Sequence, residues 1–301
     1  TSNAQIDGMS TLKIDTSLPL LKSNNMYKET LTPKISFRIN PGNNMDNYSG
    51  SSANISANNV FGINRLGISN DFEAGRSVTF GLDYKFDPLD DNLLENEKDN
   101  LSENVMNLPS EIRNDQYLEI KLATVVRDQN ENDIPLTSTL NRKNSNLFGS
   151  ITNNLFDNLN LIYDFSLDNN MKTINSNTIE TEISINNFVT SFNFIEQRHE
   201  IGSTHLLSNT TEYKFNDNTS LRFSTRRNKE INLTEYYDLS YEYKNDCLIA
   251  ALRFNKSFYK DNDLKPTEDL FFSITLFPLT TYERENNKKR PGASGLRGWF
   301  R

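Results

Sequence analysis

The chain has 301 residues, a formal net charge of −8 and a mean hydropathy of −0.66. This acidic balance argues against a nucleic-acid partner, because phosphate binding needs clustered Lys and Arg. The sequence lacks the long apolar run that a transmembrane helix needs, and its 19 Phe and 12 Tyr argue against disorder. A membrane barrel stays possible, because each of its strands shows an apolar residue to lipid only at every second position.

Apolar and polar residues alternate over stretches of roughly ten residues, the period of a strand with two different faces. The clearest stretches are Val78–Phe86 and Leu159–Leu167. Others lie at 12–14, 35–39, 118–122, 179–185, 188–194, 213–215, 221–223, 239–243, 248–254 and 270–276. The pattern predicts an all-β fold between Leu12 and Leu279, one antiparallel sheet of about fourteen strands that forms a partial transmembrane barrel. Its outward apolar set is expected to include Phe80, Phe165, Phe192 and Leu252.

The connections between these stretches fall into two kinds. Short turns are predicted at 156–158 and 216–218, where Asp and Asn tolerate tight turn geometry. Longer polar loops are predicted from Asp87 to about Asp115 and from Asp128 to about Asn144. Residues 1–280 are expected to form part of a barrel, and the basic tail, 281–301, to be disordered. Because the sequence starts at Thr1, we expect an export signal upstream.

Two other arrangements share this pattern. A soluble β-sandwich also alternates, and its solvated face also accepts charges such as Lys85 and Glu119. Aromatic residues near predicted strand ends, among them Phe86, Phe156 and Phe258, favour a barrel, because such rings gather at the headgroup level of a membrane. A porin or receptor barrel would have the same strands, so both a soluble surface protein and another membrane barrel remain alternatives.

Residues that carry catalytic or metal chemistry are sparse. His199 and His205 have no zinc-like spacing, and the acidic residues of 87–99 lack the ordered spacing of a calcium loop. No nucleophile motif, phosphate loop or dinucleotide motif occurs. We therefore expect no cofactor, no metal and no enzymatic activity, with a barrel enzyme that uses unrecognised lumen or rim residues as the open exception.

Two segments resemble a known family. In Asn58–Leu82, an expected strand ends near Arg65-Leu66-Gly67 and is followed by an acidic turn. Glu73-Ala74-Gly75-Arg76 then leads into a strand with Phe80-Gly81-Leu82. The second segment, 239–276, has a Tyr-rich strand, Asp246-Cys247, an aromatic turn and a closing Phe-rich strand. Both are similar to the LptD (OstA) family of lipopolysaccharide-assembly proteins.

The resemblance implies a large outer-membrane barrel that carries lipopolysaccharide to the outer leaflet of a Gram-negative bacterium through a lateral gate. Residues 1–280 would be the C-terminal part of this barrel, with its first strands and a periplasmic domain upstream. The resemblance also implies two protein partners, an outer-membrane lipoprotein that plugs the barrel and a periplasmic protein that delivers lipopolysaccharide. The strand with Leu270, Phe272, Ile274 and Leu276 is expected to be a sheet edge and one side of that gate.

Cys247 is the single cysteine, and proteins of the outer membrane fold in an oxidising compartment. A disulfide partner must lie elsewhere, either upstream in the natural protein or in another protein, and the resemblance favours a periplasmic domain of the same chain. This role requires Cys247 to lie at the periplasmic rim. A buried free thiol is the alternative.

Overall fold

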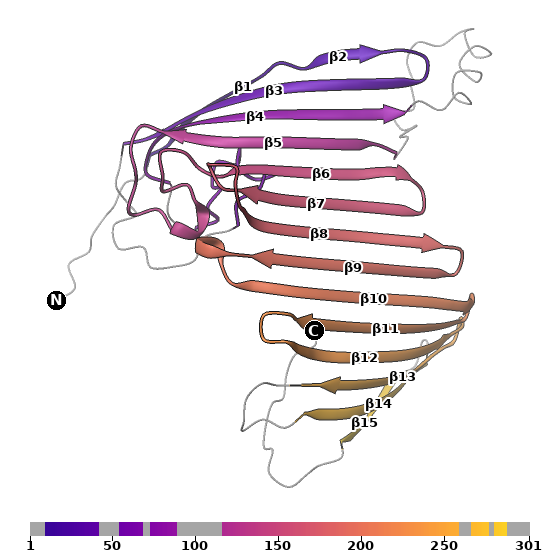
Figure 1. Ribbon diagram of the computed structural model, residues 1–301. Coiled ribbons are helices and arrows are strands. Elements are labelled where there is room, and N and C mark those ends of the chain that lie inside the picture. The colour runs from indigo at the N-terminus through magenta and orange to yellow at the C-terminus, as the bar shows by residue number, and fades with distance from the viewer. Residues whose placement is uncertain are drawn as a thin grey trace, which may run out of the picture. The chain divides into compact units, whose positions relative to one another are not determined.

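The computed structural model describes residues 10–41, 54–68, 73–88, 116–258 and 266–276, and the backbone of 280–287 (Figure 1). Their regular secondary structure consists of strands, apart from two short 3-10 helices, η1 (Leu136–Ser138) and η2 (His199–Ile201). None of their helices is long and apolar enough to cross a membrane. The strands are β1 (Leu12–Ser17), β2 (Leu20–Ser23), β3 (Tyr27–Asn40), β4 (Gly75–Pro88), β5 (Leu118–Arg127), β6 (Leu147–Phe156), β7 (Leu159–Leu167), β8 (Ile174–Ile185), β9 (Phe188–Gln197), β10 (Thr204–Asn216), β11 (Thr219–Asn228), β12 (Leu233–Lys244), β13 (Leu248–Ser257), β14 (Thr267–Leu276) and β15 (Thr280–Asn287).

All of these strands belong to one antiparallel sheet. Its order is β1-β3-β4-β5 and so on through β15, with β2 paired to β3 beside β1 (Figure 1). The fourteen-strand path confirms the predicted all-β sheet. No second sheet packs on it among the described residues, so the sandwich alternative is excluded for this part of the chain. The ends of the described order are β1 with β2, and β15.

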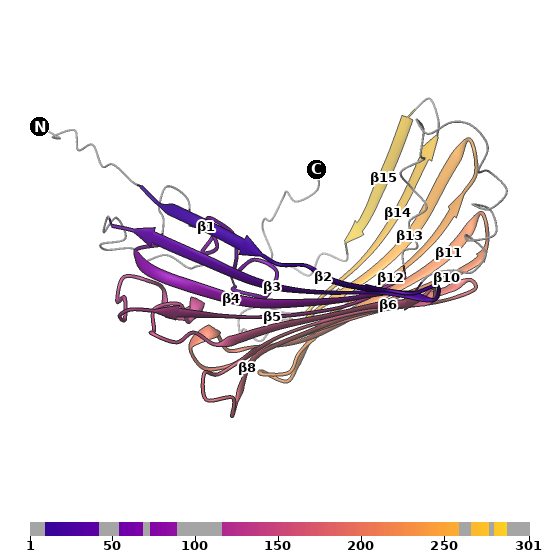
Figure 2. The ribbon, with the colours of Figure 1, turned by 90° about the horizontal axis from the view of Figure 1, so that it is seen from above.

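Internal contacts divide the chain into two units, which we describe separately. The first unit comprises Thr1–Ile183 and Asn193–His205, and the second comprises Ser184–Phe192 and Leu206–Arg301. In the first, β3, β4 and β5 lie side by side in both views (Figure 2). In the second, β10 to β15 pair in chain order.

Strand pairing aligns the alternating residues into rows, because partners in an antiparallel pair share a face. In the first unit Ile35 pairs with Phe80. In the second unit Tyr241 pairs with Leu252, and Leu252 with Phe272. Each unit therefore has an apolar face, which carries these rows, and a polar face on the other side.

The apolar faces are exposed to a degree that is unusual for large side chains. Phe80 is 44%, Phe192 41% and Leu252 45% exposed, as expected for an outward set. Phe165 is half-buried, because its ring lies against Gly149 of the neighbouring strand. Contiguous exposed apolar surface of this kind marks contact with lipid or protein.

Each alternating stretch that the sequence revealed lies within a strand, and the turns at 157–158 and 217–218 are confirmed. Three strands escaped prediction. In β6, Gly149 and consecutive asparagines interrupt the alternation, β2 is only four residues long, and β15 has the polar sequence TTYERENN. The expectation of a disordered tail is therefore wrong for 281–287. Residues 288–301 and most of the predicted loop at 87–115 lie outside the described residues.

The β1 edge is interrupted by a pair of prolines. Pro19 separates β1 from β2, and both strands pair with β3 on either side of Pro33. The Pro33 carbonyl accepts a hydrogen bond from the Leu18 amide at 3.1 Å, so the side of Pro33 that lacks an N–H faces this break. The missing donor therefore does not weaken the β3–β4 ladder, in agreement with the usual position of proline at sheet edges.

Candidate functional site

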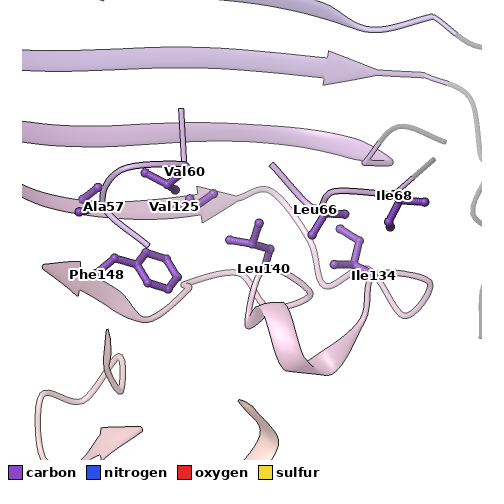
Figure 3. Packing of buried hydrophobic residues seen from close by; sticks show 9 residues of the cluster. Ala57, Val60, Leu66, Ile68, Val125, Ile134, Leu140 and Phe148 are labelled. Atoms are coloured by element: carbon purple, nitrogen blue, oxygen red, sulfur yellow. The ribbon is translucent and has the colours of Figure 1, made fainter. Parts of the chain in front are cut away.

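Two connecting segments, 54–68 and 128–146, cover part of the polar face of the first unit, and we call them the lobe. Their apolar side chains pack with Val125 of β5 and Phe148 of β6, which point away from the apolar face (Figure 3). Val60, Leu140 and Val125 are 0% exposed, and Phe148 is 1% exposed. The predicted polar loop at 128–144 is thus wrong in character, because Ile134 and Leu140 anchor it in a core.

The 54–68 segment consists of consecutive turns and is not the strand that the resemblance implied before Arg65. Asparagine side chains replace strand pairing as partners of the backbone. Asn59 Nδ2 donates to the Asn54 carbonyl at 2.7 Å, and Asn64 Nδ2 donates to the Ile68 carbonyl at 2.8 Å. Such local bonds compete with regular secondary structure, which explains why this stretch turns.

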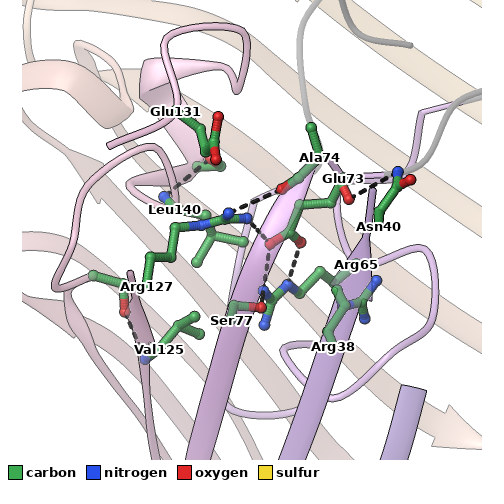
Figure 4. A network of polar contacts seen from close by, with 12 residues as sticks. Arg38, Asn40, Arg65, Glu73, Ala74, Ser77, Val125, Arg127, Glu131 and Leu140 are labelled. Carbon is green, nitrogen blue, oxygen red and sulfur yellow. Dashed lines mark hydrogen bonds and ion pairs between the residues drawn. The ribbon is translucent and has the colours of Figure 1, made fainter. Parts of the chain in front are cut away.

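A buried ion network joins the lobe to the sheet (Figure 4). Arg65 binds Glu73 through two hydrogen bonds of 2.5 Å, from Nε to Oε2 and from Nη2 to Oε1. Its guanidinium also donates to Thr79 Oγ1 at 2.9 Å and to Ser77 Oγ at 3.0 Å, on β4. The side chains of Arg65 and Glu73 are 1% and 2% exposed. A bidentate pair at this depth fixes the geometry of the segment that contains it.

Arginines from two strands complete the network. Arg127 of β5 pairs with Glu73 and donates to the Ala74 carbonyl at 2.9 Å. Arg38 of β3 donates to the carbonyls of Gly62 and Ile63, each at 2.5 Å, in the lobe. The single Glu73 carboxylate therefore links a turn segment to β4 and β5, while Arg38 holds the same segment to β3.

Glu73 lies just before β4, outside the strands. Burial alone raises the pKa of its carboxyl, but the charges and hydrogen bonds of Arg65, with Arg127 and Arg38, outweigh burial and hold the pKa below its ordinary value. The Glu73 carboxylate is therefore ionised at neutral pH when the lobe is packed on the sheet. Opposite charges close by stabilise the ionised form in this way.

Two glycines of the quoted motif are required by the lobe. Gly75 has a φ of +82°, and a Cβ there would lie 2.3 Å from Glu131 Oε1. At Gly81 a Cβ would lie 2.5 Å from the ring of Phe61, which rests on the strand at this point. The Lys34 ammonium is 5.8 Å from the centre of the same ring. The absence of a side chain at Gly81 thus lets the Phe61 ring of the lobe pack directly on the backbone of β4.

A family model described as "LptD: LPS transport system D" matches residues 2–218. The chain belongs to the LptD family. The match contains the lobe, the ion network and both glycines, and it ends in the turn before β11. The function of this family is lipopolysaccharide transport and assembly at the bacterial outer membrane, and LptD proteins are transporters and not enzymes.

Comparison with solved structures finds porins. A triple mutant of the Rhodopseudomonas blastica porin has a TM-score of 0.36 and 10% identity, over 93% of this chain and 86% of that chain. Another mutant of the same porin has a TM-score of 0.35 and 11% identity, over 92% and 89%. No curated protein matches the chain. The fold assignment rests on the strand pairing of the chain itself.

The predicted gate strand in this LptD-family chain is β14. Leu270, Phe272 and Leu276 lie on the apolar face and are 44%, 42% and 44% exposed. Ile274 lies on the same face and is half-buried. The expectation that this strand is an edge is wrong, because β14 pairs with β13 on one side and with β15 on the other. The polar sequence of β15 concealed the true last strand of the described sheet.

Cys247 is an exposed free thiol in the turn between β12 and β13. The Asn245 side chain forms this turn by accepting from the amides of Cys247 at 3.0 Å and Leu248 at 2.8 Å. In the second unit, the turns at 186–187, 217–218 and 245–247 are short and lie at one end of the strands. The 229–232 connection lies at the other end, where β13 also ends at Ser257 and β14 begins at Thr267.

Histidine and acidic residues do not converge in the described part of the chain. No group of three or more His, Cys, Asp or Glu side chains there could hold a metal ion. His199 lies in η2, and the His205 ring meets Phe194 edge to face at 5.5 Å. The acidic stretch at 87–99 lies mostly outside the described residues.

Proposed function

We propose that this LptD-family chain releases lipopolysaccharide sideways, through a lateral gate whose one side is the β14–β15 end of the sheet. The observation that carries this proposal is the β15 edge, which has no further strand beside it in the described sheet. Unpaired backbone groups are costly in hydrocarbon unless another strand meets them. A strand that meets this edge and separates from it would open a path from the polar face to the membrane.

Crosslinking to the transported lipid tests the gate. A photoreactive amino acid at Tyr282 or Glu283, two consecutive residues of β15, is expected to capture lipopolysaccharide in cells. The same group at Leu221 of β11, inside the sheet, serves as the matched control. Capture at Leu221 equal to that at β15 would show general lipid contact and would contradict a gate at this edge.

The polar face of the second unit offers a surface for the plug lipoprotein that the family resemblance implies. Its arginines are exposed and form ion pairs, such as Arg222 with Glu212 at 2.6 Å and Arg253 with the buried Asp238 at 2.6 Å. Charged groups arranged this way favour a polar protein partner. Reversal of Arg222 and Arg253 to glutamate is expected to reduce copurification of the lipoprotein, whereas reversal of Arg76 on the apolar face should leave it unchanged.

Cys247 is proposed to form a disulfide at the periplasmic end. Short turns face the periplasm in outer-membrane barrels, and Cys247 lies in such a turn. Its partner would be a cysteine in the periplasmic domain of the natural protein, near the point where the periplasmic carrier delivers lipopolysaccharide. Non-reducing electrophoresis of the natural protein should show altered mobility for Cys247→Ser, and unchanged mobility would refute the bond.

A further inference from the structure

A shallow groove lies on the apolar face of the first unit, at the end of the strands from which the lobe segments extend. Its volume is about 390 Å³, within the range of small-molecule sites. Phe37, Ile39 and Val126 in its wall are 50%, 43% and 38% exposed. The side chains that shape it from this face are Phe37, Ile39, Arg76, Val78, Val126 and Asp128, and we call it the Arg76 groove.

Arg76 is the charged group of this groove that the protein leaves unsatisfied. Among the described residues it makes no ion pair and no hydrogen bond, and the same holds for Asp128. Arg38 and Arg127 also border the groove, but their guanidinium groups are occupied on the other face. Arg38 binds carbonyl groups of the lobe, and Arg127 binds Glu73 and the Ala74 carbonyl. Ser77 of β4 pairs with Arg127 of β5. Arg76 and Asp128 are the next residues beyond this pair, so they follow it on the two adjacent segments.

The position of Arg76 fits a membrane interface. An arginine on a lipid-facing surface costs about 2–4 kcal/mol at the bilayer midplane and about 0–1 kcal/mol near the headgroups. Arg76 is the second residue of β4, at the strand end. The free-energy cost of Arg76 on the lipid-facing surface is therefore low at the level of the headgroups. There an anionic headgroup can contact the guanidinium, and the hydrocarbon of the same lipid can contact Phe37 and Val78.

A peptide is a poor occupant of the Arg76 groove. β3 and β4 are paired with strands on both sides near it, and the outer side of β5 is bonded to the 143–145 segment through the Val126–Asn144 bridge. These strands therefore offer no free backbone edge for an added strand. The combination of one unpaired guanidinium, one unpaired carboxylate and an apolar wall instead fits a lipid whose headgroup carries both phosphate and sugar hydroxyls.

We propose that the Arg76 groove binds one phosphorylated glycolipid molecule of the lipopolysaccharide class at the outer surface of the sheet. Arg76 donates to the phosphate, Asp128 accepts from a sugar hydroxyl, and an acyl chain lies along Phe37, Val78 and Val126. This site rests on the proposed lateral release, since it holds glycolipid that has reached the membrane. It is separate from the polar face and from the β15 edge in the chain's own topology.

Equilibrium binding of radiolabelled diphosphorylated lipid A to the full chain in detergent micelles tests the site. Arg76→Gln is expected to weaken binding about tenfold, which corresponds to the loss of one charge-assisted hydrogen bond. Lys172→Gln is the matched control. Lys172 is an exposed cation in the 168–173 connection at the same end of the strands, so its loss should leave the affinity unchanged.

Chemically altered lipids separate the parts of the proposal. Dephosphorylated lipid A should bind wild type and Arg76→Gln equally, and Val126→Gln should weaken both lipid forms. Equal weakening by Arg76→Gln and Lys172→Gln would overturn the site in favour of diffuse charge attraction. Competition by phosphatidylglycerol as strong as that by lipid A would overturn a glycolipid site. The assay needs no export, so failure of the gate at β15 leaves it interpretable.

Discussion

The polar faces of the two units use the same residue types in opposite ways. In the first unit the lobe covers Arg65, Glu73 and Arg127, whose side chains are 1–2% exposed. In the second, Arg222 pairs with Glu212 across neighbouring strands, and their side chains are 57% and 21% exposed. A buried network depends on every member, because a missing partner leaves an unpaired charge away from water. Exposed pairs carry no such dependence, since water replaces the lost partner.

The comparison is tested most strongly at Glu73. Glu73→Ala leaves two guanidinium groups buried without their carboxylate, and we expect a loss of about 3–5 kcal/mol in the stability of the lobe. Hydrogen exchange of the amides in 54–68 and 128–146 would measure it, with the amides of β12 as an internal reference. Unchanged exchange in the lobe would contradict the role of the network.

Acid should open the same region. The pKa of Glu73 is lower in the folded protein than its ordinary value of 4.5, so its ionisation stabilises the closed lobe above that value. This stabilisation is lost as pH falls below 4.5 and through the folded pKa. Limited proteolysis from pH 7 to pH 3 should cut the lobe of wild type increasingly at acid pH. Glu73→Gln should be cut at all pH values, with the Glu73-dependent part of the pH response absent.

A change at the contact between Phe61 and Gly81 should destabilise the protein less than Glu73→Ala. Gly81→Ala puts a methyl group against the Phe61 ring, and overpacking of this kind costs about 1–3 kcal/mol. Phe61→Leu removes the ring, so the double variant should be less destabilised than the sum of the two single changes. Urea denaturation of the four proteins would measure this coupling, and simple additivity would argue against contact between the two positions.

The smallest effect belongs to the second unit. Glu212→Gln should change stability by only about 0.2–1 kcal/mol, because Arg222 stays solvated. The change should shrink further at high salt, which screens exposed charges. These values apply to the chain measured without a partner protein, in which a loss as large as that of Glu73→Ala would contradict a solvated ion pair.

Regular alternation made most strands predictable, and interruptions hid the rest. Val78–Phe86 shows the strand period directly, whereas Gly149 in β6 interrupts the period because it makes room for Phe165. The β15 sequence offers no apolar row, so β14 was mistaken for an edge. Pairing partners depend on long-range contacts, and no local pattern in the TTYERENN segment reports them.

The lobe was the least predictable part of the candidate site. Ile134 and Leu140 are isolated apolar residues in a polar stretch, and their burial depends on Val125 and Phe148 of the sheet. The Arg65 and Glu73 motif was visible by resemblance, but its ion pairing was not. Three apolar residues in a predicted solvated loop, Ile134, Leu136 and Leu140, were the available signal that the loop folds back on a core, and Leu136 stays exposed.

The prolines at the β1 edge bear on how the chain avoids wrong assembly. An exposed strand edge invites pairing with another copy of the chain, and unfolded membrane proteins must cross an aqueous compartment in which such pairing would accumulate. Pro19 removes one donor from that edge, and its position divides the edge into segments of six and four residues, β1 and β2. Short segments template aggregates poorly. The same interruption limits the number of consecutive residues over which a correct partner strand can pair with this edge.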